Sequence, residues 1–144
     1  MKKQIVRTLM MISLVMAMGV MVGSAQAQSL GNKMRINIPF EFNVGDSKLP
    51  AGEYSVGRAM STSGDAVLLI SNVNHSDSAF PLTNSAQSRN RKDVDTLVFH
   101  RYGDQYFLYQ VWPGGGTYGR ELVKSRSERE LQRKTPHEIV QVGN

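Results

Sequence analysis

The sequence predicts an all-β protein, either an antiparallel sandwich or a partly open barrel, with a short helix near the C-terminus. The first observation is the alternation of apolar and polar residues over 34–44, which is the period of a strand with one buried face. The second is a pair of segments, 96–102 and 105–112, that are rich in aromatic and β-branched residues and flank a Gly-Asp pair. Turn-forming residues separate the apolar runs, as they do in sandwiches and barrels.

Residues 1–27 are typical of a signal peptide. Three basic residues begin the chain, the apolar stretch over 9–22 is short for a membrane span, and Ala25 and Ala27 form the small-x-small pattern that a signal peptidase cuts. We expect cleavage after Ala27, which leaves residues 28–144 as a single β-rich domain with no stable membrane span; an uncleaved anchor is the alternative. The sequence therefore predicts an exported protein, either periplasmic or extracellular.

Removal of this segment changes the composition and limits the function classes. Six of the eight Met residues lie in 1–27, as do three of the 17 basic residues and none of the 12 acidic ones, so the rest has a formal charge of +2. Such a small excess argues against nucleic acid or an anionic membrane surface as a partner. The chain has no Cys, which excludes disulfides and thiol chemistry and leaves packing as the source of stability.

The first strand is expected over 34–44 and a second over 53–59. Pro39 has no amide hydrogen, so the first strand should lie at a sheet edge or be broken at that residue. Turn residues at 45–46 and 49–52 separate the two strands.

Three further segments precede the hairpin. The apolar run 66–70 shows little alternation, which predicts a strand covered on both faces. Residues 79–85 form a weaker strand that Pro81 interrupts, and the basic residues 89–92 are expected in a solvated loop rather than in a binding patch.

The segments 96–102 and 105–112 are expected to form a hairpin in the centre of a sheet. With a two-residue loop, Phe99 faces Leu108 and His100 faces Phe107. The residues expected on one side are Leu97, Phe99, Tyr106, Leu108 and Trp112. Those expected on the other are Val98, Phe107, Tyr109 and Val111.

A glycine loop, a helix and a last strand complete the chain. Residues 113–116 form the loop, and a phosphate loop would need a Lys-Ser/Thr pair and a helix directly after it, which the sequence lacks. Residues 127–130 fit a helix capping box. The helix has a thin apolar face, chiefly Leu131, so it should lie on the surface and end before Pro136. Residues 138–142 predict a last strand.

Three long segments together resemble a family of small exported bacterial proteins, best known from soil bacteria. The segments are IPFEFNVGDSKLPAGEYSV (38–56), LVFHRYGDQYFLYQVW (97–112) and GRELVKSRSERE (119–130), and the family carries such blocks in the same order. The resemblance covers most of the chain after residue 27. It brings no established activity or ligand to this chain, so the function is argued from the residues.

The favoured function is a non-catalytic binding module for a small ligand or a glycan. Aromatic rings beside arginines, around the hairpin and the glycine loop, can stack on sugars or on apolar ligands. The candidate ligand-binding residues are Arg101, Tyr102, Tyr109, Trp112, Tyr118 and Arg120. Trp112 and Tyr118 flank the loop and are expected to be the exposed members, while core packing is the alternative role for all of these rings.

Two other function classes stay open. Residues 120–130 carry charges of both signs that fit a structural or protein-interaction component of the cell envelope, although a solvated helix explains them as well. A hydrolytic enzyme is the weaker alternative, because no motif holds His75, His100 or His137 beside a nucleophile. We predict no catalytic residue, no metal site and no cofactor, since three His and no Cys are few ligands for a metal.

Overall fold

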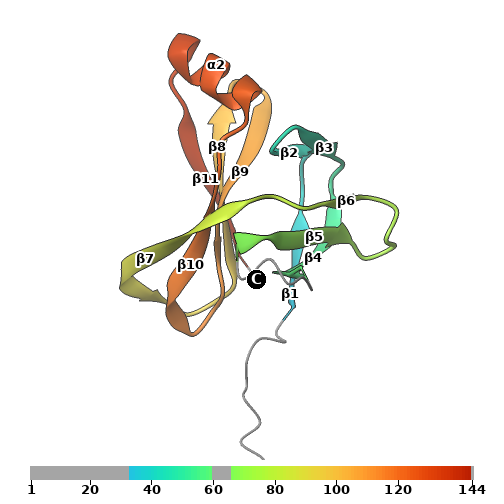
Figure 1. The fold of residues 1–144 in the computed structure, drawn as a ribbon, viewed down its shortest axis with the longest axis vertical. Coiled ribbons are helices and arrows are strands. Elements are labelled where there is room, and N and C mark those ends of the chain that lie inside the picture. The colour runs from blue at the N-terminus through green and yellow to red at the C-terminus, as the bar shows by residue number, and fades with distance from the viewer. Residues whose placement is uncertain (1–32, 60–65, 144) are drawn as a thin grey trace, which may run out of the picture. The chain divides into compact units, whose positions relative to one another are not determined.

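The computed structural model describes residues 33–59 and 66–143, and these residues form two β-sheets and one helix (Figure 1). The prediction of an all-β protein with mostly antiparallel strands and a short C-terminal helix is confirmed, and the described strands form no closed barrel. The predicted signal peptide, with Ala25 and Ala27, lies outside the described residues.

The smaller sheet has the strand order β1-β4-β5-β6, and all of its pairs are antiparallel. Its strands are β1 (Met34–Ile38), β4 (Gly52–Arg58), β5 (Leu68–Asn72) and β6 (Ser78–Ala79). β1 is the edge strand and ends directly before Pro39, after which the chain continues as β2 (Phe42–Val44) in the larger sheet. The proline therefore marks both an edge and a break, because it cannot donate to a strand ladder.

The larger sheet has the strand order β11-β8-β9-β10-β7, and β2 and β3 (Ser47–Leu49) attach beside β9. Its other strands are β7 (Thr83–Lys92), β8 (Thr96–Tyr102), β9 (Gln105–Trp112), β10 (Gly116–Leu122) and β11 (Glu138–Gly143). The predicted hairpin is β8 and β9, which lie inside the sheet as expected, and the predicted last strand is β11.

The two sheets share one hydrophobic core. Ile36, Tyr54 and Ile70 of the smaller sheet pack in one cluster with residues of the larger sheet. The alternation predicted for the first strand is observed, since every second residue of β1 is buried. We call the side of the larger sheet that faces this cluster its core face; it carries Leu97, Phe99, Leu108, Val111 and Leu122.

Two local predictions are wrong, and one strand was not predicted. Residues 66–70 are not covered on both faces, since Leu69 of β5 is half-exposed. Residues 89–92 belong to β7 rather than to a loop, and the strand β10 after the glycine loop was not predicted. In both cases antiparallel pairing between β7 and β10 organises polar segments that have little strand character of their own.

A β-bulge in β9 changes which hairpin residues share a face. Phe99 pairs with Leu108 and His100 with Phe107, as predicted, but Val98 pairs with Gln110. Tyr109 is therefore an extra residue in β9, and the alternation reverses beyond it. As a result Val111 joins the core and Trp112 turns to the opposite face, the reverse of the prediction.

The helix α2 (Arg126–Lys134) packs against the other side of the larger sheet, which we call the helix face. This face carries Val98, His100, Tyr102, Phe107 and Trp112, all of them buried. The N-cap lies two residues before the predicted capping box, because it is Ser125, whose Oγ accepts a hydrogen bond from Glu128 N at 3.1 Å. It ends before Pro136, as predicted.

Candidate functional site

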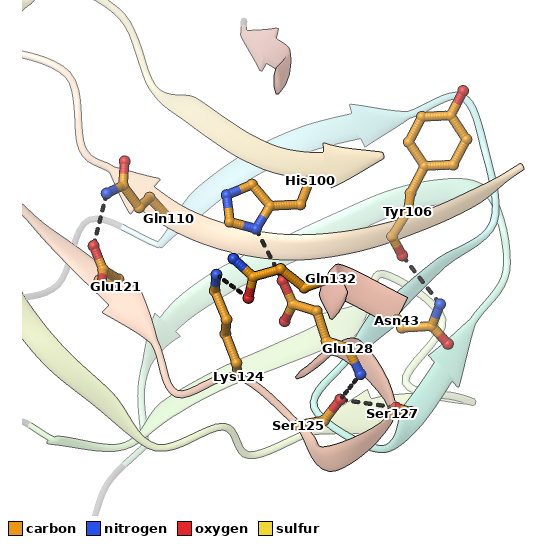
Figure 2. A network of polar contacts seen from close by, with 10 residues as sticks. All are labelled: Asn43, His100, Tyr106, Gln110, Glu121, Lys124, Ser125, Ser127, Glu128 and Gln132. Atoms are coloured by element: carbon orange, nitrogen blue, oxygen red, sulfur yellow. Dashed lines mark hydrogen bonds and ion pairs between the residues drawn. The ribbon is translucent and has the colours of Figure 1, made fainter. Parts of the chain in front are cut away.

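A buried hydrogen bond between a histidine and a carboxylate joins α2 to the helix face (Figure 2). His100 Nδ1 lies 2.9 Å from Glu128 Oε1, and the two residues have exposed fractions of 3% and 4%. Ionisable groups are rarely buried this deeply unless they are paired. The pair therefore sets the electrostatics of this part of the structure.

The N-terminus of α2 explains how Glu128 reaches this position. Glu128 is the third helical residue after the cap Ser125, where a capping-box carboxylate ordinarily turns back to the backbone of the cap. In α2 this carboxylate bonds His100 instead, and Glu128 is the buried residue of the helix. This role was not predicted, because the mixed charges of 120–130 are typical of a solvated segment. The available signal was the spacing of Glu128 and Leu131, which places them on one helix face.

Three aromatic rings surround the His100 ring. Tyr109 stacks on it with ring centres 3.9 Å apart, and His137 lies at 4.3 Å. Tyr102 lies 5.5 Å from His137 and 6.2 Å from His100. We call His100, Tyr102, Tyr109, Glu128 and His137 the His100 cluster. It joins residues of the hairpin, of α2 and of the segment before β11.

The hydroxyl of Tyr102 is the unsatisfied polar group of the cluster. Its Oη is buried and has no hydrogen-bond partner among the described residues. Burial raises the pKa of Tyr102, and the negative charge of Glu128 raises it further. The phenol therefore stays protonated at neutral pH, and its missing hydrogen bond costs about 1–3 kcal/mol.

Lys124 and Gln132 lie at the outer rim of the cluster. Lys124 Nζ donates to Gln132 Oε1 at 3.1 Å and lies 5.7 Å from the centre of the Tyr109 ring. Burial raises the pKa of Tyr109, and Glu121 acts in the same direction. Glu121 Oε2 accepts a hydrogen bond from Gln110 Nε2 at 2.9 Å. The rim thus places one cation and one carboxylate near Tyr109.

The structure brings His137 to His100 and leaves His75 elsewhere. His137 follows α2 and is exposed to solvent. Desolvation lowers the pKa of His137, and the positive charges of His100 and Lys124 lower it further, while the negative charge of Glu128 opposes them in part. His75 lies in a turn with a φ of 57° and bonds Ser71 Oγ at 3.2 Å. Within the described part of the chain, no three His, Cys, Asp or Glu side chains are arranged to hold a metal ion.

The six predicted ligand-binding residues do not form one surface. Tyr102 is buried in the His100 cluster, and Tyr109 is half-buried there. The expectation that Trp112 is exposed is wrong, since its exposed fraction is 5%. Its indole lies against Gly119, and its Nε1 donates to Gln110 Oε1 at 3.1 Å. The bulge turns Trp112 onto the helix face, and the absence of a side chain at Gly119 makes room for the ring.

Arg101 is held at the turn of the hairpin. Its Nε donates to Gly103 O at 2.8 Å, and its Nη1 lies 3.5 Å from Glu138 Oε2. The guanidinium also lies 5.6 Å from the centre of the Tyr106 ring. These contacts explain its position as part of the hairpin structure.

Tyr118 and Arg120 share a side of β10 with two residues of β7. In the register of the pair, Tyr118 lies opposite Gln87 and Arg120 opposite Ser85. Arg120 Nη1 donates to Ser85 Oγ at 3.3 Å. This side belongs to the core two residue pairs farther along, at Leu122 and Thr83, but at Tyr118 it is open, and the exposed fraction of that residue is 69%. The exposure predicted for Tyr118 is confirmed. We call Tyr118, Arg120, Gln87 and Ser85 the open β10–β7 face.

Comparisons with known proteins do not place the chain in a family. No family model, curated protein or solved structure matches the chain. A search of the described helices finds none with the length and apolarity needed to cross a membrane. The function is therefore argued from the geometry.

Proposed function

We propose that the protein is an exported, non-catalytic binding module whose open β10–β7 face binds a glycan. The observation that carries the proposal is the Tyr118 ring, which is 69% exposed although it stands on a strand that pairs with both β7 and β9. A ring on a paired strand loses little conformational entropy when a ligand settles on it. An exposed aromatic ring on a rigid strand is thus a favourable stacking surface.

The neighbours of Tyr118 supply the polar contacts that a sugar needs. The apolar face of a sugar ring can stack on the phenol, while Arg120, Gln87 and Ser85 offer donors and acceptors to its hydroxyl groups. Cross-strand neighbours lie about 5 Å apart and alternate residues of one strand about 7 Å apart. The four side chains therefore cover a patch suited to a single sugar ring or a short chain.

Trp112 takes no part in this site. Gly119, on which its indole packs, points to the side of β10 opposite Tyr118 and Arg120. The fluorescence of Trp112 is consequently a poor reporter of binding. Backbone amide shifts along β7 and β10 are the appropriate measurement.

The test is titration of the labelled protein with glycans and small ligands of the bacterial envelope, followed by NMR and calorimetry. We expect shifts concentrated on β7 and β10, and an affinity that falls about tenfold in Tyr118→Ala, which corresponds to about 1.4 kcal/mol. Phe80→Ala is the matched control, because it removes another exposed aromatic ring outside the face. Absence of shifts on these strands, or an equal loss in both variants, would contradict the proposal.

The second candidate function is contact with another envelope protein, and an exposed apolar pair favours it. Leu82 and Val123 are both exposed, and they are neighbours because Val123 N donates to Leu82 O at 3.1 Å. Cross-linking in envelope extracts would compare the native chain with the double variant Leu82→Ser, Val123→Ser. We expect a partner that the variant loses; equal recovery by both chains would rule out this surface.

A further inference from the structure

We propose that His100, Glu128 and His137 form an acid-sensitive clasp, which holds α2 against the larger sheet at neutral pH and releases the helix in acid. The proposal concerns the helix face and does not depend on the glycan site. It rests on how the helix is attached, on the distances within the His100 cluster and on the groups that surround it.

The attachment of α2 depends mainly on one polar contact. Glu128 is the buried residue among the nine of the helix, and Leu131 is half-buried. Arg126 and Glu130 pair on the solvent side, where the side chains keep exposed fractions of 86% and 54%. An isolated helix of this length is not stable in water. Loss of the Glu128–His100 contact should therefore release the helix and allow it to unwind.

The cluster accommodates one proton well and a second one poorly. A single proton shared across the 2.9 Å contact satisfies both His100 and Glu128. A further proton on His137 faces the first across a ring separation of 4.3 Å. Protonation of His137 therefore weakens the clasp.

The phenols and the nearest cation do not relieve this repulsion. Tyr102 and Tyr109 have raised pKa values, so they carry no charge between neutral pH and acid. Lys124, directly before α2, adds positive charge and lowers the pKa of His137. In the docked arrangement His137 is therefore favoured in its neutral form.

The remaining nearby carboxylates are held by other groups. Glu121 of β10, which faces Tyr109, accepts a hydrogen bond from Gln110 at 2.9 Å. Glu138 of β11 lies 3.5 Å from Arg101. Glu128 is thus the carboxylate that balances the histidines.

Release of α2 should leave the two sheets folded. The hydrophobic core is built from strand residues and includes none from α2. Elements that open locally are those with few buried apolar contacts, which describes this helix. Acid should therefore expose the helix face without unfolding the sandwich.

Hydrogen exchange of the native chain at about pH 7.5 and about pH 5 tests the clasp, since these values lie on either side of the ordinary His pKa of about 6.5. After correction for the intrinsic pH dependence of amide exchange, the protection factors of the α2 amides should fall about tenfold in acid, while those of the β8 and β9 amides should not change. His137→Gln should lose more than half of this acid response. His75→Asn, which replaces a histidine outside the cluster at a positive φ that Asn tolerates, should respond like the native chain.

Three results would overturn the proposal. The first is equal protection of α2 at both pH values. The second is loss of protection in the sheets together with the helix, which would mean global unfolding. The third is an acid response in His137→Gln equal to that of the native chain.

Discussion

Loss of the Glu128 carboxylate should destabilise the protein much more than loss of the exposed Glu130 carboxylate of the same helix. Glu128→Ala leaves His100, with an exposed fraction of 3%, without its partner at 2.9 Å. Removing one member of a buried pair costs about 3–5 kcal/mol. We expect the lower end, about 3 kcal/mol, because undocking of α2 lets water reach His100 and limits the loss.

Urea and thermal unfolding followed by circular dichroism would measure this effect. In a domain of this size, a loss of about 3 kcal/mol lowers the melting temperature by roughly 12 °C. Glu130→Ala is the matched control, since its ion pair with Arg126 at 3.0 Å is exposed and worth about 0.5 kcal/mol or less. The two variants thus remove the same group from the same helix in two environments.

A double variant separates the pair from the packing around it. His100→Leu with Glu128→Leu replaces the buried polar groups by apolar ones, so it should cost at least about 1 kcal/mol less than Glu128→Ala alone. The reasoning is refuted if Glu128→Ala and Glu130→Ala destabilise the protein equally. It is also refuted if the double variant is as unstable as the sum of its single variants.

Three other predictions concern residues around the helix face. Gly119→Ala should cost about 2–3 kcal/mol in urea unfolding, because a Cβ there would clash with the Trp112 ring and would lie 2.7 Å from Val111 O, whereas Gly116→Ala on the same strand has 3.8 Å of room and should be nearly neutral. Ser125→Ala removes the cap of α2 and should cost about 1 kcal/mol, with the loss seen in helix-specific hydrogen exchange. Burial raises the pKa of Tyr102 in the folded protein above its value of about 10 in the unfolded chain. The contribution of Tyr102 to stability is therefore complete below about pH 10 and is lost as the pH rises above that value. Tyr102→Phe should remove part of that alkaline loss and, because it deletes an unsatisfied hydroxyl, should raise the free energy of unfolding at neutral pH by about 1 kcal/mol; an unchanged pH profile would contradict the assignment.

The hairpin shows how much of the structure local sequence patterns can predict. The Gly-Asp turn and the aromatic, β-branched arms correctly predicted both strands and the pairs Phe99 with Leu108 and His100 with Phe107. The bulge at Tyr109 was not predictable, because one extra residue leaves the composition of the strand unchanged. It is accommodated by the neighbouring strands, and it reversed the faces of Val111 and Trp112.

The edge strand β7 of the larger sheet shows what local sequence patterns cannot predict. β7 is polar and basic along much of its length, which is why residues 89–92 were expected in a loop. It is a strand because its backbone pairs with β10, and backbone hydrogen bonding does not depend on side-chain hydropathy.

The sequence by itself determined the fold class, the buried face of β1, the hairpin and the helix that ends before Pro136. These features follow from local period, turn chemistry and capping, which act over a few residues. Tertiary structure alone decided the His100 cluster and the burial of Trp112. His100 and Glu128 are 28 residues apart, so their contact depends on how α2 returns to the sheet, which no local pattern records. Trp112 is buried because the bulge in β9 turns it onto the helix face.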